Sequence, residues 1–258
     1  MTLSEAIEAK TGVCLSLSSF CIFFTYSMIM ENYIKMPQTV VVQNSSAQFI
    51  NMVISCTHAS ISACWSLYCF YTDDDVVSDM INHSTVSTYL LCCFSGGYFL
   101  HDALHYIRHI KLSKCWEILL HHTVVSACFG TAILSHRYVN FSTMALLVEI
   151  NSVFLHIRKI LILIGYSKNS DIYKVNGILN ILSYIFFRIC VIGWMCRWSI
   201  INFHITEQPY NTIGTVGLVV MTVINIILFG RILVKDNWIK LHTVFPSTSF
   251  NKPSEHKM

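Results

Sequence analysis

Residues 85–107 read TVSTYLLCCFSGGYFLHDALHYI, an apolar run that is long enough to cross a lipid bilayer. The run nevertheless contains His101, Asp102 and His105. An ionisable side chain inside a membrane is costly unless it is paired or hydrated. Because this cost has to be offset by partners or water, the run indicates both a membrane-spanning helix and a buried polar site.

The composition of the whole chain also indicates a membrane protein. Its 258 residues are 54% hydrophobic and only 12% charged, with a mean hydropathy of +0.55. A soluble domain carries about 25% charged residues, so this chain is neither a soluble globular enzyme nor a disordered polymer. With 17 basic against 14 acidic residues, it also lacks the broad basic surface that nucleic-acid binding uses.

Apolar runs separated by polar or turn-forming residues predict an all-α fold, a polytopic transmembrane helical bundle of about six to seven spans. The runs are 11–30, 47–71, 85–107, 117–135, 138–164, 177–200 and 212–233. We interpret the first run as a retained anchor rather than a cleaved signal, because Glu5 and Glu8 make a poor n-region. The predicted parts are an anchor span with a cytosolic loop at 1–43, a bundle domain at 44–238 and a disordered cytosolic tail at 239–258.

The distribution of charged residues predicts the orientation. Alternate connections place ten basic residues on one side: Lys35, Arg108, Lys111, Lys114, Lys168, Lys174, Lys235, Lys240, Lys252 and Lys257. The other side holds only three basic residues, Lys10, Arg137 and Arg197, together with the acidic segment Asp73–Asp75 and Asp79. Because positively charged loops stay in the cytosol, the C-terminus is predicted to be cytosolic. Asn82, in the acidic loop, is then the glycosylation candidate among three N-x-[ST] sequons, whereas Asn44 is cytosolic and Asn140 lies too near the membrane.

Ionisable and amide side chains inside the runs are the candidate site residues: His58, Asp102, Glu117, His121, His122, Glu149, Asn151, Arg158 and Arg188. One interpretation is that they are hydrogen-bonded contacts between helices. The other is a partly hydrated cavity in which a histidine and a carboxylate act on a lipid. For Arg188 we expect a carboxylate partner such as Glu149, or a position near an interface.

Other kinds of site receive little support from the sequence. His101 and His105 form one histidine box, but too few histidines have the spacing of a di-iron centre, and no metal site is predicted. The eleven cysteines contain no C-x-x-C pair, and no G-x-S-x-G nucleophile elbow occurs. Paired broken spans, which would suggest a transporter, are not visible either.

Spans three to five together resemble the TLC (TRAM, LAG1, CLN8) domain family. The resemblance rests on Phe94–Asp102 (FSGGYFLHD), Trp116–His122 (WEILLHH) and Leu146–Arg158 (LLVEINSVFLHIR), with His58 and Phe186–Arg188 (FFR) also in place. It covers about residues 44–238 and is greatest toward the branch of TLC domain-containing proteins 1 and 2. The family's ceramide synthases follow the histidine pair with Asp-Asp. Here Glu149 stands in the corresponding span.

The resemblance implies a helical bundle whose partners are membrane phospholipids. Proteins of the branch that it resembles limit the incorporation of polyunsaturated acyl chains into phospholipids, which keeps the membrane less fluid. The expected location is the plasma membrane, with the endoplasmic reticulum as the alternative. Whether the effect is catalytic stays open at this point.

The alternative function is an acyltransferase that joins an acyl-CoA co-substrate to a lysophospholipid, or to an amino lipid as ceramide synthases do. His121 or His122 would act as the general base, and Asp102 or Glu117 would orient the imidazole. Arg108, Lys111 and Lys114 could then hold the phosphates of the donor. The simpler interpretation of that basic loop is the positive-inside rule. No resident cofactor is expected under either function.

Overall fold

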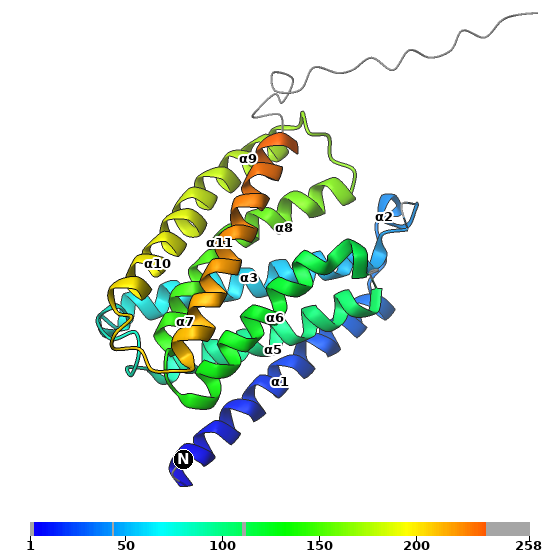
Figure 1. Ribbon diagram of the computed structural model, residues 1–258. Coiled ribbons are helices and arrows are strands. Elements are labelled where there is room, and N and C mark those ends of the chain that lie inside the picture. Colours follow the sequence, from blue (N-terminus) through cyan, green and yellow to red (C-terminus); the bar gives the residue numbers. More distant parts are fainter. Residues whose placement is uncertain (1–2, 43, 110–111, 236–258) are drawn as a thin grey trace, which may run out of the picture.

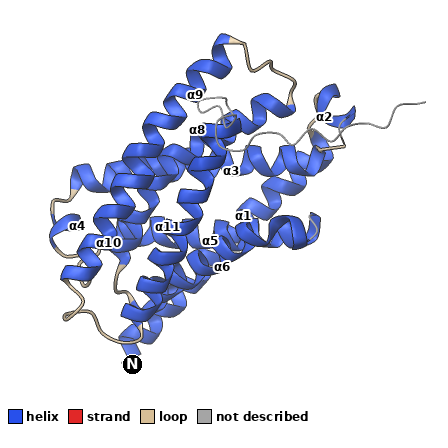
Figure 2. Ribbon diagram, turned by 45° about the horizontal axis from the view of Figure 1, so that its top comes forward, coloured by secondary structure: helices blue, strands red, loops and turns tan. Residues whose placement is uncertain are grey.

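The computed structural model of the chain describes residues 3–42, 44–109 and 112–235. These residues form helices and loops and contain no strand (Figures 1 and 2). The long helices are α1 (Leu3–Tyr33), α3 (Ser46–Thr72), α5 (Val86–His109), α6 (Leu112–Ser135), α8 (Glu149–Leu163), α9 (Asp171–Ser183), α10 (Val191–Ile201) and α11 (Tyr210–Lys235). Shorter helices are α2 (Gln38–Val42), α4 (Asp75–Ser78) and α7 (Val139–Ala145). The predicted tail at 239–258 lies outside the described residues.

The helices join into passes that match the predicted apolar runs. A 3₁₀ turn, η1 (Leu146–Val148), connects α7 to α8, and a π-helical segment, η2 (Tyr184–Cys190), connects α9 to α10. Within the described residues, five helices are long and apolar enough to cross a membrane: Ala9–Tyr33, Ser46–Thr72, Trp116–Ser135, Asp171–Ile201 and Tyr210–Lys235. Helix α5 and the pass formed by α7, η1 and α8 carry much of the buried polar set. The prediction of an all-α, polytopic bundle is confirmed.

The connections gather at the two ends of the bundle as the alternating topology requires (Figure 1). At one end, the Lys168 ammonium donates a hydrogen bond to the carbonyl oxygen of Lys235 at 2.8 Å. At the other, the backbone N–H of Tyr138 donates to the carbonyl oxygen of Ile81 at 2.8 Å, and Arg137 pairs with Glu207 at 2.6 Å. The basic and acidic connections therefore lie at opposite ends, while the side facing the cytosol stays a prediction.

Helix α1 packs closely along α5 because two small residues allow the backbones to approach. A Cβ atom added at Gly97 would overlap the carbonyl oxygen of Ser16 and lie 2.7 Å from the Cβ atom of Ser19. The Ser19 hydroxyl donates a hydrogen bond to the carbonyl oxygen of Phe94 at 2.7 Å. Small residues at a helix contact are the usual device where lipid removes the hydrophobic drive for association.

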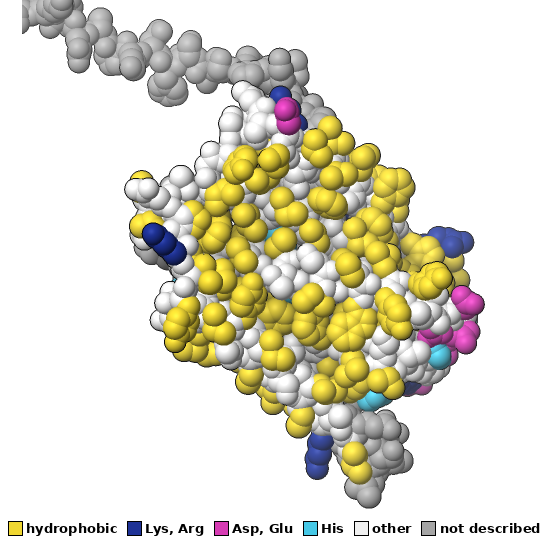
Figure 3. Space-filling view, turned by 180° about the vertical axis from the view of Figure 1, so that it is seen from behind, with side chains coloured by type: hydrophobic (Ala, Val, Ile, Leu, Met, Phe, Trp, Pro, Cys, Tyr) yellow, Lys and Arg dark blue, Asp and Glu magenta, His cyan; other side chains and the backbone are white. Residues whose placement is uncertain are grey.

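The outside of the bundle is apolar. Seen from behind, hydrophobic side chains spread over the middle of the molecule, and charged side chains lie near its margins (Figure 3). Large apolar residues on several helices are exposed, among them Ile22, Leu182, Ile189 and Ile226. In the interior, polar residues such as His58, Asn151 and Asn180 are fully buried. Soluble proteins have a polar surface and an apolar interior, and the reverse arrangement seen here is expected for a protein surrounded by lipid.

Candidate functional site

Asp102 and His122 form a buried pair at the centre of the bundle. The His122 Nε2 atom lies 2.6 Å from Oδ2 of Asp102, and the side chains are 8% and 5% exposed. Asp102 comes from α5 and His122 from α6, two helices that pack side by side. Within the described residues, Oδ1 of Asp102 and Nδ1 of His122 have no partner at strict hydrogen-bonding geometry, and the Asn51 amide lies beside the Asp102 carboxyl. Nδ1 of His122 is therefore the part of the pair with unused hydrogen-bonding capacity.

His58 is near this pair but is built into an aromatic core. Its ring stacks on Tyr98 with the centroids 3.7 Å apart, and its Nε2 atom lies 2.9 Å from the Ser62 hydroxyl and 3.2 Å from the Ser95 hydroxyl. Phe99 stands between the two groups, 5.5 Å from the His58 ring and 6.3 Å from the His122 ring. Within the described residues, His58 therefore has no hydrogen bond to Asp102 or His122.

The neighbouring histidine of α6 faces a different helix. The Nδ1 atom of His121 lies 3.1 Å from the Met221 sulfur on α11. Glu117, one turn earlier, accepts two hydrogen bonds from the Arg231 guanidinium at 2.6 and 2.8 Å and is part-exposed. Of the two carboxylates considered as the group that orients an imidazole, Asp102 occupies that position. Glu117 instead ties α6 to α11.

Arg188 lies in the π-helical segment and is held by neutral side chains. Its guanidinium donates hydrogen bonds to the side-chain amide oxygen of Asn225 and to the Ser152 hydroxyl, each at 2.8 Å. Glu149 interacts with Arg188 through charge and is hydrogen-bonded to Ser152, without forming a close ion pair with the guanidinium. The expected carboxylate partner is therefore replaced by an amide and a hydroxyl. Irregular helix geometry of this kind often accompanies functional sites.

Asn151 and Arg158 hold α8 against α9. The Asn151 amide donates to the backbone oxygen and the side-chain oxygen of Asn180, both at 2.9 Å, and to the Ser183 hydroxyl at 3.0 Å. The Arg158 guanidinium lies over the Tyr173 ring, 5.7 Å from its centroid. Both contacts join α8 to α9, and within the described residues the Oδ1 atom of Asn151 has no hydrogen-bond partner. Among the predicted residues, these two fit the interpretation as interhelical contacts.

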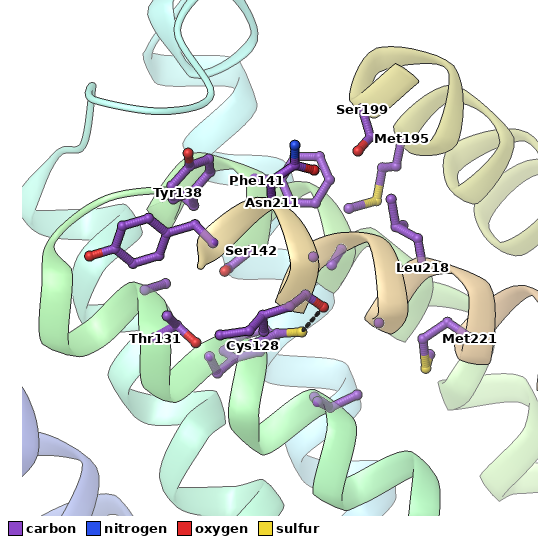
Figure 4. A pocket seen from close by; sticks show the side chains of 18 of the residues that line it. Cys128, Thr131, Tyr138, Phe141, Ser142, Met195, Ser199, Asn211, Leu218 and Met221 are labelled. Carbon is purple, nitrogen blue, oxygen red and sulfur yellow. Dashed lines mark hydrogen bonds between the residues drawn. The ribbon is translucent and has the colours of Figure 1, made fainter. Parts of the chain in front are cut away.

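An apolar cavity with about 870 Å³ of empty space, including its open mouth, lies between α6, α7, α10 and α11. Figure 4 shows labelled side chains from these helices around it, with Tyr138 and Asn211 toward one part of the cavity and Met221 farther along α11. The sulfur of Met221, one of the lining residues, also contacts His121, which precedes His122 in the chain.

The acidic loop carries titratable groups outside the membrane. The hydrogen bond between the His83 ring and Asp73, at 2.8 Å, raises the pKa of His83. Backbone N–H groups, that of Asn82 first, lower the pKa of the Asp79 carboxyl. Asn82 itself is exposed, as a glycosylation acceptor must be, whereas Asn140 is fully buried. Ligand atoms of Asp73, Asp75 and His83 lie within 4.8 Å of one another, but exposed acidic groups commonly gather in this way without an ion.

Three residues that contact Arg188 or His121 were not among the predicted site residues: Asn225, Ser152 and Met221. Asn225 interrupts the apolar run at 212–233, and an amide in such a run could have been singled out from the sequence. Ser152 and Met221 give no comparable signal, because serine and methionine are ordinary within membrane helices. Their contribution depends on which helices are neighbours, and the order of helices in a bundle is not encoded in a local pattern.

Comparison with known proteins identifies relatives of the whole bundle. The family described as "TRAM_LAG1_CLN8: TLC domain" matches residues 48–234. TLC domain-containing protein 2 of Danio rerio is 39% identical over 78% of this chain and 82% of its own length. TLC domain-containing protein 2 of Homo sapiens is 32% identical over 88% and 85%. TLC domain-containing protein 1 of Mus musculus is 28% identical over 82% and 86%.

Proposed function

Since this chain belongs to the TLC domain family, we propose that it regulates membrane phospholipid composition. In this proposal the protein binds lipid within its bundle and limits the incorporation of polyunsaturated acyl chains into phospholipids. The membrane that contains it then stays less fluid. Its place of action is the plasma membrane, with the endoplasmic reticulum as the alternative, and its C-terminus faces the cytosol.

One observation carries the proposal: an apolar cavity shares Met221 with His121, and the next residue, His122, belongs to a buried polar pair with unused hydrogen-bonding capacity. An acyl chain would occupy the apolar part, where it replaces no polar contacts. The ester or headgroup end of the lipid would then lie toward the Asp102–His122 pair, where Nδ1 of His122 has no partner within the described residues.

The test is the lipid composition of cells that lack the protein. When such cells are fed a polyunsaturated fatty acid, the polyunsaturated fraction of phosphatidylethanolamine and phosphatidylcholine should rise, and membrane fluidity should rise with it. Re-expression of the wild-type chain should reverse both changes. Unchanged lipid profiles in the null cells would refute the proposal.

A second function, acyl-CoA-dependent transfer to a lysophospholipid or amino lipid, is favoured by the geometry of the Asp102–His122 pair. If Asp102 accepts a hydrogen bond from Nε2–H of His122, the Nδ1 atom carries the lone pair and is the basic nitrogen. That nitrogen would remove the proton from the acceptor hydroxyl or amine as the acceptor attacks the thioester carbonyl. The carbon–sulfur bond then breaks, and the imidazolium returns its proton to the leaving thiolate.

The two functions differ in a measurement on purified protein. With a labelled acyl-CoA and a lysophospholipid in lipid nanodiscs, an acyltransferase forms labelled phospholipid at a rate that His122→Ala abolishes. Glu117→Gln is the matched control, because Glu117 pairs with Arg231 outside the polar centre. If no lipid environment yields turnover, the transferase function fails. The composition-regulating function would then act by lipid binding alone.

A further inference from the structure

A second cavity, separate from the Asp102–His122 centre, lies between α1 and α5. It encloses about 790 Å³ of empty space, including its mouth, and α1 lies outside the region that matches the family, which begins at residue 48. Three histidines one turn apart on α5 line it: His101, His105 and His109. Helix α1 contributes Glu31, which accepts a hydrogen bond from the Ser27 hydroxyl at 3.4 Å.

The ionisable residues of this cavity differ in exposure between its rim and its floor. Glu31, Arg108 and His109 are exposed at the rim, whereas His101 and His105 are 3% and 5% exposed. Arg108 and Glu31 both line the cavity with His101, and within the described residues they do not form an ion pair with each other. The rim therefore has one anionic and one cationic group that do not pair with each other and that can bind a ligand.

The floor contains a polar atom that lacks a partner. Within the described residues, the Nδ1 atom of His101 is buried and has no hydrogen-bond partner. Leaving a buried donor or acceptor unpaired is unfavourable, and because this atom has almost no accessible surface, a ligand supplies the missing bond only when the His101 ring turns toward the cavity. The remaining lining is apolar, with Phe24, Met28 and Leu104 beside the polar groups. The Arg108 guanidinium lies over the Phe24 ring, 5.6 Å from its centroid, which keeps it at the mouth.

These features fit the headgroup of a zwitterionic phospholipid. We propose that the cavity between α1 and α5 binds the headgroup of a phosphatidylethanolamine molecule from the adjacent leaflet. The phosphate lies toward Arg108 and the histidines, and the ammonium group lies toward Glu31. The acyl chains continue along exposed apolar residues next to the rim, such as Ile29 and Ile107. The inference rests on the proposed lipid role and adds a site in which α1, which precedes the family domain, supplies one wall.

Other ligands fit the cavity less well. Among the described residues, the ligand atoms of the three histidines do not gather within the 4.8 Å that a shared metal ion would require. A highly anionic donor such as an acyl-CoA would meet Glu31 at the rim. Lys111 and the side chain of Lys114, which could have added positive charge, lie outside the described residues. An ammonium beside a phosphate satisfies both rim charges at once.

The experiment measures lipid binding to the purified full-length chain in detergent by native mass spectrometry. We expect one phosphatidylethanolamine per chain, with Arg108→Gln weakening binding about tenfold through the lost charge-assisted bond to phosphate. Glu31→Gln should weaken the binding of phosphatidylethanolamine by a similar factor. It should leave the binding of phosphatidylglycerol unchanged, because that lipid has no ammonium group. Lys35→Gln removes an exposed charge from the loop after α1, outside the cavity lining, and should change nothing.

Three outcomes would overturn the inference. The first is that every variant binds all lipids with equal affinity, and the second is that Lys35→Gln loses as much affinity for phosphatidylethanolamine as Arg108→Gln. The third is saturable binding of inorganic phosphate or Zn²⁺ alone in place of lipid. Thermal unfolding of each variant shows whether the fold is kept, and the exposed positions of Glu31 and Arg108 favour intact variants. Lipid binding is measured without cells, so failure of the proposed function in null cells would leave this result independent.

Discussion

Asn151 is the residue at which the two interpretations of the buried polar set separate most clearly. From the sequence it belongs with the histidines and carboxylates as a candidate site residue. In the structure its amide donates only to groups of α9, at 2.9, 2.9 and 3.0 Å. Asn151→Ala should therefore lower the stability of the bundle and leave the Asp102–His122 geometry in place.

The magnitude follows from the number of donors. An amide has two N–H groups, so the three acceptors share at most two full hydrogen bonds. Interhelical hydrogen bonds in membranes contribute about 0.6–2 kcal/mol each, so Asn151→Ala should cost about 1–4 kcal/mol. Since about 1.4 kcal/mol is a factor of ten, the folding equilibrium constant should fall by roughly five- to several-hundred-fold.

The assay is reversible unfolding in mixed micelles of a non-ionic detergent and sodium dodecyl sulfate, followed by the fluorescence of the five tryptophans. Asn169→Ala, in the exposed α8–α9 loop, is the matched control and should unfold like the wild type. If Asn151→Ala also unfolds like the wild type, Asn151 is not an interhelical contact. An unchanged stability combined with a lost lipid phenotype would place Asn151 in the site instead.

Three further outcomes are expected. Gly97→Ala should destabilise the protein by about 1–3 kcal/mol in the same assay, because its Cβ overlaps α1; Gly130→Ala, whose Cβ meets nothing within 4 Å, should not. The hydrogen bond to Asp73 raises the pKa of His83, so its stabilisation is fully present below the ordinary histidine pKa and is lost as pH rises through the folded value. A melting temperature of His83→Gln that tracks the wild type at every pH would contradict this. Asn82→Gln should abolish a glycosidase-sensitive gel shift of the protein expressed in cells, and a shift that persists would place the glycan elsewhere.

The sequence contained most of the information about the fold. Each predicted apolar run corresponds to a helical pass, because the length and hydropathy of a span are local properties of the chain. The interruptions were not predictable to the same degree. The 3₁₀ turn before Glu149 and the π-helical segment around Arg188 depend on contacts between helices, and the polar residues at these positions give no distinct local pattern.

The candidate site was predicted as a set of residues but not as an arrangement. The sequence indicates that burying Asp102 and His122 costs free energy, and in the structure the two side chains are paired. The same cost argument also selected Glu117 and Asn151, which serve contacts between helices. The local sequence indicates that burying a polar group costs free energy. Only the packing of the helices shows whether its partner is another helix or an open cavity.

The measurement that tests the central claim most directly is rescue of the lipid composition by variants of the buried pair. Null cells fed a polyunsaturated fatty acid would express the wild type, Asp102→Asn, His122→Gln or the control Glu117→Gln at matched levels. The wild type and Glu117→Gln should lower the polyunsaturated fraction of phosphatidylethanolamine and phosphatidylcholine, and the two variants of the pair should not. Full rescue by Asp102→Asn and His122→Gln would contradict the assignment of this pair as the functional centre.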